Sequence, residues 1–197
     1  MTRTALAGWI LIVSTWSGQG LAQEPDLSWI AQDQLAARQV LVDFGDDPRF
    51  RGFIRAAVMI EAPVERVWAI ITDCESATEY VKKVLSCVLL ETLEDQDAQI
   101  FRQRVKFTWF LPSFEHDFRL DYEPFHRIMV SKASGPLEVL NGTWWFVPGG
   151  DRGTTLIYSL NFDPGLPIPR FVVGRTLRND VPAILTSVRD RAEAAAP

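Results

Sequence analysis

The sequence has few of the groups with which proteins bind metals, phosphates or nucleic acids. It contains two cysteines and two histidines, and Cys74, Cys87, His116 and His126 do not form a recognisable zinc-ligand pattern. A G-x-S-x-G nucleophile elbow and a glycine-rich loop leading into a helix are both absent. Acidic residues outnumber basic ones by 25 to 20, for a net charge of −5, which argues against nucleic acid as a partner. We therefore expect no metal, no other cofactor and no nucleic acid.

No apolar run in the N-terminal region is long enough to span a membrane comfortably. The run at residues 5–13 follows the positive charge of Arg3 and precedes a small-x-small sequence at residues 20–22. A spanning helix needs about 20 apolar residues, whereas this arrangement is typical of a cleaved secretory signal. We predict a signal peptide at residues 1–22, with a retained anchor as the alternative. The mature chain is then secreted, into a bacterial periplasm.

The two cysteines are too few for a disulfide framework but enough for a single bridge. Cys74 and Cys87 belong to a chain whose predicted compartment tolerates disulfides. A bridge requires a short distance between their Cα atoms, which the sequence does not supply. A disulfide and a pair of buried free thiols therefore both stay open.

The segment at residues 57–81 changes from a strand pattern to a helical one. A short apolar run ends at Ile60, and Pro63 then suits the first turn of a helix. Apolar residues follow at helical spacing: Val64, Val67, Trp68 and Ile71. This pattern predicts an amphipathic helix at residues 64–73. A short helical segment is also predicted at the N-terminal side of the domain, within residues 23–37.

Alternating apolar residues and turn clusters predict a series of strands. They are expected at residues 39–44, 52–61, 84–94, 98–111, 114–122, 127–134, 143–147 and 154–162. Most of the connections are short, so consecutive strands must be antiparallel, and the first two should form a hairpin. Apolar residues at helical spacing predict a final helix at residues 169–194, kinked at Pro182, which is long enough to cover the sheet.

Three segments together resemble a known superfamily. They are the strand that leads into the Pro-started helix, the segment NGTWWFVPGGDRGTTLIYSLNFDPG, and the final PIPRFVVGRTLRNDVPAILTSVRDRAE. They are similar to the START-like (SRPBCC) superfamily of polyketide cyclase/dehydrase and lipid-transport domains. The resemblance implies one α+β domain at residues 38–197 with a helix-grip fold, in which a curved antiparallel sheet wraps around a long C-terminal helix. It also implies an apolar cavity between sheet and helix.

The inward positions of the predicted strands are unusually aromatic. A core packed solid by these side chains is one interpretation, and the cavity implied by the resemblance is the other. The adjacent Trp144 and Trp145 leave open which tryptophan points inward. On the cavity interpretation the expected ligand-binding residues are Phe101, Gln103, Val105, Phe107, Trp109, Phe114, His116, Phe118, Leu120, Trp144, Phe146, Tyr158 and Leu160 on the strands, with Phe171, Leu177 and Val181 on the final helix.

Polar residues are rare on this inward face. Gln103, His116 and Tyr158 are the clear examples. His116 can act as a general base, contact a ligand, or serve the structure alone. His126, beside a turn, is expected to be exposed to solvent.

The resemblance and the small polar content favour a monomeric carrier of one apolar molecule. Ligands implied by the superfamily are sterols, isoprenoid quinones, carotenoids, phospholipids and fatty acids. The predicted periplasmic location adds hopanoids to these candidates. A cyclase- or dehydratase-like enzyme that uses His116 is one alternative, and an interaction protein with a filled core is the other. Apolar residues in the loops at 109–112 and 163–169 suggest transient contact with a membrane or a partner while the ligand passes. The alternative is that these loops fold back onto the domain.

Overall fold

The computed structural model describes residues 24–45, 52–107, 109, 111–149, 153–165 and 167–194. The predicted signal peptide at residues 1–22 lies outside the described residues. Within the described ranges, no helix is both long enough and apolar enough to cross a membrane. Because residues 1–22 are not described, secretion of the mature chain stays a prediction.

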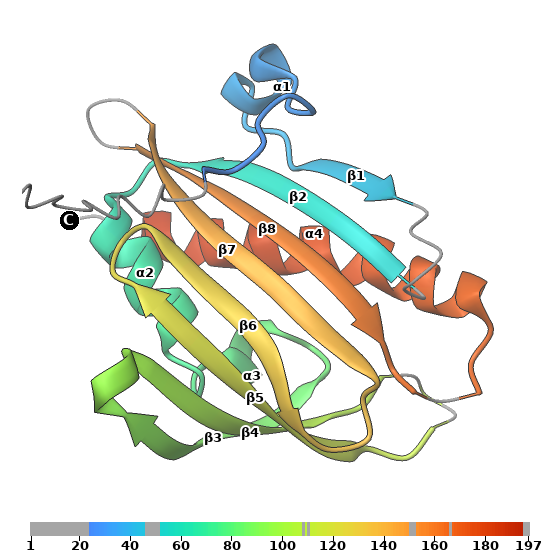
Figure 1. The fold of residues 1–197 in the computed structure, drawn as a ribbon. Helices are drawn as coiled ribbons and strands as arrows, with labels where there is room; N and C mark the ends of the chain where they lie inside the picture. Colours follow the sequence, from blue (N-terminus) through green and yellow to red (C-terminus); the bar gives the residue numbers. More distant parts are fainter. Residues whose placement is uncertain are drawn as a thin grey trace, which may run out of the picture.

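A curved antiparallel sheet wraps around a long C-terminal helix (Figure 1). In the described part of the chain the sheet has eight strands, in the order β1-β2-β8-β7-β6-β5-β4-β3. Their bounds are β1 (Leu41–Gly45), β2 (Gly52–Ile60), β3 (Val84–Leu93), β4 (Ala98–Val105), β5 (Phe114–Glu123), β6 (Arg127–Ser134), β7 (Val139–Gly149) and β8 (Gly153–Asp163). The α+β helix-grip fold expected from the sequence is confirmed.

The connections explain the strand order. β1 and β2 form the expected hairpin, and β3 to β8 form a meander in which each strand pairs with the next. The connection between β2 and β3 instead contains two helices, α2 (Val64–Thr72) and α3 (Ala77–Tyr80). This longer crossing places β3 at the far edge of the sheet, so that β2 pairs with β8.

The long helix α4 (Arg170–Ala194) fills the concave side of the sheet. Its buried residues recur every three or four positions: Val173, Leu177, Val181, Leu185, Val188 and Ala192. This spacing places them on one face of the helix, which packs on the sheet. The helix continues through Pro182, and the Thr186 hydroxyl donates a hydrogen bond of 2.9 Å to the Pro182 carbonyl.

A smaller apolar cluster lies on the convex face of the sheet. Trp145 and Ile157 pack there under α1 (Gln32–Ala36), which contributes Leu35. Trp145 therefore points outward and its neighbour Trp144 points toward the concave side, where it contacts the main core. The helix α1 is shorter than the predicted segment because Asp26 accepts hydrogen bonds from the backbone and the hydroxyl of Ser28, which fold this stretch into a turn.

The structure has a disulfide between Cys74 and Cys87. Their Cα atoms lie 5.6 Å apart, within the usual range for a disulfide. The bond joins the α2–α3 connection to the edge strand β3. Of the two possibilities left by the sequence, the structure therefore has the bridge.

Candidate functional site

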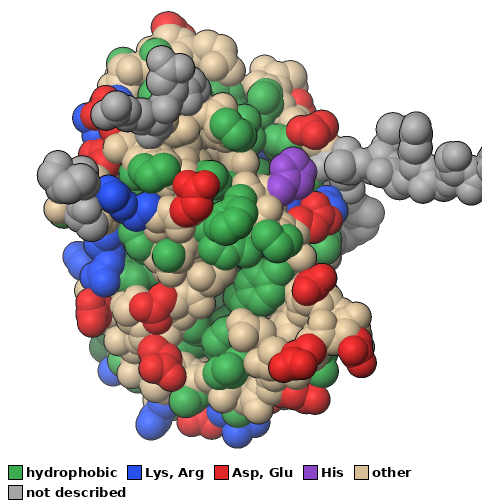
Figure 2. All heavy atoms as spheres, turned by 90° about the vertical axis from the view of Figure 1, so that its left-hand side faces the viewer, with side chains coloured by type: hydrophobic (Ala, Val, Ile, Leu, Met, Phe, Trp, Pro, Cys, Tyr) green, Lys and Arg blue, Asp and Glu red, His purple; other side chains and the backbone are tan. Residues whose placement is uncertain are grey.

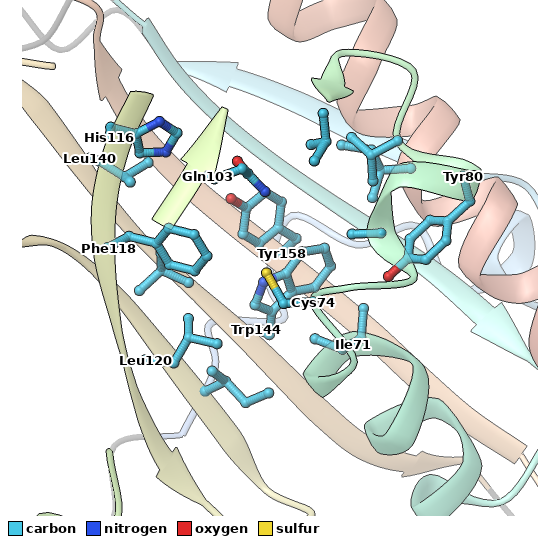
Figure 3. A pocket seen from close by; sticks show the side chains of 16 residues that line it. Ile71, Cys74, Tyr80, Gln103, His116, Phe118, Leu120, Leu140, Trp144 and Tyr158 are labelled. Atoms are coloured by element: carbon cyan, nitrogen blue, oxygen red, sulfur yellow. The ribbon is translucent and has the colours of Figure 1, made fainter. Parts of the chain in front are cut away.

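A partly open, largely apolar cavity of about 200 Å³ lies between the concave face of the sheet and the helices. Strands β3 to β8 supply one wall, and α2, α3 and α4 supply the other. Six residues expected at the site from the sequence line this cavity, and Figure 3 labels all of them: Gln103, His116, Phe118, Leu120, Trp144 and Tyr158. The lining contains no lysine, arginine, aspartate or glutamate.

Strand register brings the polar residues of the lining together. Gln103 on β4 is paired directly with His116 on β5, so both side chains lie on the same face. On the neighbouring strands Trp144 is paired with Tyr158, and their rings stack with centroids 3.8 Å apart. Figure 3 shows the amide of Gln103 and the hydroxyl of Tyr158 on the same side of the cavity, with the His116 imidazole beyond them.

His116 is buried, and one of its two ring nitrogens has no hydrogen-bond partner among the described residues. Its side chain is 6% exposed, and its ring lies between those of Phe114 and Phe118, at centroid distances of 6.0 and 5.9 Å. Its Nδ1 atom is buried and receives no hydrogen bond from the described residues. Burial lowers the pKa of His116 to about 4, although the nearby Asp117 carboxylate acts in the opposite direction. The imidazole is therefore neutral at pH 7.

Two tyrosines of the lining are also held neutral. Burial raises the pKa of Tyr158 well above its ordinary value. Burial raises the pKa of Tyr80 to about 12, and its hydroxyl donates a 3.0 Å hydrogen bond to the Ile70 carbonyl. The cavity therefore offers neutral polar groups in an apolar wall.

The remaining inward residues divide between core and surface. Val105, Phe114, Phe101, Phe107, Phe146, Leu160, Leu177 and Val181 belong to the main core but do not line the cavity. Phe146 packs on Trp68 and Phe107 on Phe162, with ring centroids 5.0 and 5.6 Å apart. The concave face of the sheet is therefore filled by aromatic rings at both of these contacts. The cavity lies elsewhere on this face, between the strands and the helices α2, α3 and α4.

Two expected site residues lie at the surface instead of in the core or the cavity. Trp109 is 87% exposed. The paired strand β4 ends at Val105, and the inward alternation continues only to the buried Phe107. Phe171 is 75% exposed. It precedes the buried Val173 by two positions, which corresponds to a rotation of roughly 200° around the helix axis. Both assignments to the cavity are wrong.

His126 also differs from its expected exposure. It is half-buried, and its ring meets that of Trp145 edge-on, with centroids 5.7 Å apart. Its Nε2 atom is buried without a hydrogen-bond partner in the described residues. The tight turn before it, where Phe125 has a φ of 60°, folds His126 back against the convex cluster.

Sequence reasoning missed the lining residues that do not come from the aromatic strands. Ile71, Ala77 and Tyr80 come from α2 and α3, and Ile128 and Val130 come from β6. The period-two spacing of Ile128 and Val130 was a usable signal. The four-residue helix α3 offered no periodicity from which its inward side could be predicted.

A second hollow opens at the end of the molecule where α2, the β3–β4 turn and the end of β5 meet. Its volume is about 440 Å³, and its lining includes Trp68, Leu93 and Tyr122 together with Glu94 and Asp97. Figure 2 views the molecule from this side and shows hydrophobic side chains in a hollow, with acidic side chains around it. It is more open to solvent than the inner cavity, which is therefore the stronger candidate for enclosing an apolar ligand.

A metal centre has no support in the described ranges, where no group of three or more histidines, cysteines and acidic residues could hold an ion.

A family model described as "Polyketide cyclase / dehydrase and lipid transport" matches residues 60–189. The chain belongs to this family. Its START-like fold accounts for the cavity, because the sheet and α4 of such a domain enclose a space between them. No curated protein sequence matches the chain.

Solved structures of START-like proteins have the same fold. A STAR-related lipid transfer protein fragment from Xanthomonas axonopodis is 18% identical, with a TM-score of 0.67, and the match covers 78% of this chain and 93% of that one. Human STARD10 is 14% identical, with a TM-score of 0.68 and coverage of 90% and 84%. The Zhui aromatase/cyclase from Streptomyces is 18% identical, with a TM-score of 0.63 and coverage of 72% and 93%. At these identities the likeness shows the fold alone.

Proposed function

We propose that this START-like protein binds one apolar molecule in the cavity between the sheet and α4 and carries it between membranes. The observation that supports this is the partly open cavity with an uncharged, largely apolar lining. Burying about 300 Å² of apolar ligand surface stabilises a complex by about 7 kcal/mol before ordering costs, at about 25 cal/mol per Å². The volume of about 200 Å³ is below the roughly 300–1,000 Å³ of most ligand sites. The ligand is therefore small, or enters with only part of its length.

We also propose that the mature protein works as a monomer in a bacterial periplasm. The signal-like sequence at residues 1–22 supports this. The Cys74–Cys87 disulfide is consistent with it, because such bonds persist mainly in oxidising compartments.

Native mass spectrometry tests the proposal. The full chain is expressed in a bacterial host and purified from the periplasm without detergent. We expect a protein mass that begins at Gln23, together with a complex that carries one apolar molecule. Two variants fill the cavity from opposite walls, Ala77→Phe on α3 and Ile184→Phe on α4. Each should reduce the bound fraction by about tenfold or more, because the added ring occupies the ligand's space.

The matched control is Ala69→Phe, which adds the same ring at an exposed position of α2. It should retain the ligand, and circular dichroism checks that all three variants are folded. If the folded cavity-filling variants carry as much ligand as the control, the ligand lies elsewhere. If the wild-type protein carries no bound molecule and does not bind a fluorescent lipid, the result favours the alternative of an interaction protein with a filled core.

Catalysis is the second candidate function, since the family includes cyclases by its description and His116 lies in the cavity. A general base works best when its pKa is near the working pH. The pKa of His116 is lowered to about 4, so its neutral ring is a weak base. The same neutral ring can still donate or accept a hydrogen bond to a bound molecule. These properties favour binding over catalysis.

We further propose that the end of the molecule with Trp109 and Phe171 contacts a membrane. Both side chains are largely exposed. The chain segments that precede these two residues contact each other. Phe107, just after β4 and before Trp109, stacks on Phe162 near the end of β8, and β8 leads to α4, where Phe171 lies. Large exposed apolar groups at one end of a soluble domain are typical of interaction sites.

Tryptophan fluorescence with vesicles of phosphatidylcholine and phosphatidylglycerol checks this contact. We expect a blue shift when vesicles are added to the wild type, because an indole that enters the lipid interface leaves water. The shift should shrink in Trp109→Phe, and Phe171→Ala should weaken vesicle binding. An equal shift in the wild type and Trp109→Phe would exclude Trp109 from the contact.

A further inference from the structure

We propose that the cavity selects a neutral, ring-shaped apolar molecule with a hydroxyl or carbonyl group, and rejects carboxylates and phosphates. This inference rests on the proposed function, because it takes the cavity as the ligand site. It separates the ligand classes that the sequence left equivalent. Sterols, hopanoids and quinones have such neutral oxygen groups, whereas fatty acids and phospholipids carry anionic ones.

The first argument is the polar cluster at one side of an otherwise apolar space. Gln103, His116 and Tyr158 all line the cavity, and Gln103 and His116 are paired across adjacent strands. The polar ends of Gln103 and Tyr158 lie on the same side in Figure 3. An amide, a neutral imidazole and a phenol can each donate and accept hydrogen bonds. A ligand hydroxyl or carbonyl among them would have partners of either kind.

The second argument is the unsatisfied state of His116. It is 6% exposed, and its buried Nδ1 atom has no hydrogen-bond partner among the described residues. Buried polar groups in folded proteins are nearly always hydrogen-bonded, and an unpaired one in an apolar wall is costly. A ligand that brings an oxygen to this wall would remove that cost. A purely hydrocarbon ligand would not.

The third argument is charge. Among the described residues, no cationic side chain lines the cavity. Lys83, which lies close to this region of the core, is paired with Asp180 at 2.8 Å. The charged groups next to His116 in the chain are the carboxylates Glu115 and Asp117. Asp117 is held by Arg102 on the opposite face of the sheet. An anionic headgroup would therefore be buried without a counter-charge, which is strongly unfavourable.

The shape of the wall favours rings over extended chains. The rings of Trp144 and Tyr158 stack within 16° of parallel, and both residues line the cavity beside the polar cluster. Phe118 lines the same cavity from β5. Flat aromatic surfaces pack well on other flat ring systems.

Three small probes test charge and polarity separately, by calorimetric titration at pH 7. They are 2-naphthol, 2-naphthoate and naphthalene, which share one ring system. We expect 2-naphthol to bind about tenfold or more tightly than 2-naphthoate. In His116→Phe its affinity should fall by about threefold to tenfold, as for the loss of one hydrogen bond, while naphthalene binding stays within about twofold. Tyr158→Phe, which removes one hydroxyl, tests the same cluster with little change of volume.

The control variant is His126→Phe, because His126 lies against the convex cluster and does not line the cavity. It should bind all three probes as the wild type does. Equal affinity for 2-naphthol and 2-naphthoate would overturn this inference and leave the proposed carrier function intact. Equal 2-naphthol binding by folded His116→Phe, Tyr158→Phe and the wild type would overturn the role of the polar cluster. If none of the probes binds, while a native ligand is found in the cavity, selection of small neutral rings is wrong. If no ligand of any kind binds, the proposed function fails as well.

Discussion

Removal of the Cys74–Cys87 disulfide is expected to lower the free energy of unfolding by about 3 kcal/mol. The cysteines are 13 positions apart, and closing a loop of this length in the unfolded chain restricts it by about that amount. The bond also holds the α2–α3 connection against β3, which is an edge strand with β4 as its single neighbour in the described sheet. Removal of the bond should therefore give the unfolded chain more conformational freedom and should also loosen this edge of the native sheet.

Urea unfolding of the double variant Cys74→Ala/Cys87→Ala, compared with the oxidised wild type, measures the effect. The wild type treated with a reducing agent is the control and should unfold near the urea concentration of the variant. A variant as stable as the oxidised protein would show that the bond contributes little. Reduced and oxidised wild type that unfold together would lead to the same conclusion.

The main elements of the fold could be predicted because their residues repeat with a clear period. The final helix has buried residues every three or four positions from Val173 to Ala192, and this pattern depends on nothing outside the helix. Short turns likewise required antiparallel neighbours from β3 to β8. The position of β3 at the edge could not be worked out this way, because it depends on how α2 and α3 cross the open end of the sheet.

The candidate site was predictable on the strands and much less so elsewhere. Gln103, His116 and Tyr158 were found because alternation along a strand determines which side chains face inward. The same rule placed Trp109 incorrectly, since alternation has meaning only while the strand is paired, and β4 ends at Val105. Phe171 was misplaced because apolar character alone does not determine the face of a helix.

Whether the aromatic face is open or filled depends on distances that no local pattern contains. Phe146 and Trp68 close one part of the space, whereas Ala77, a small residue on α3, leaves room in another. The disulfide was undecidable for the same reason, because it depends on the distance between the Cα atoms of two segments.

The stability of the protein should fall as the pH is lowered from about 6.5 toward 4, by about 3 kcal/mol through His116 alone. The pKa of His116 in the folded protein is about 4, from an ordinary value of 6.5, because burial disfavours its charged form. In this pH range the unfolded chain binds a proton at His116 that the folded chain does not bind. The free energy of unfolding therefore rises with pH across the range and is unaffected by His116 above it. A difference of about 2.5 pKa units corresponds to about 3 kcal/mol.

Urea unfolding of the wild type and His116→Phe at several pH values between 7.5 and 4.5 isolates this effect. Carboxylates contribute to the pH dependence of both proteins, including Asp117, whose pKa is lowered chiefly by its hydrogen bond from Arg102, so their contribution cancels largely in the difference. The stability of the wild type relative to His116→Phe should decline as the pH falls below about 6.5. A constant difference would mean that His116 stays charged or exposed in the folded protein. The inference that no cationic group faces the cavity at pH 7 would then be wrong.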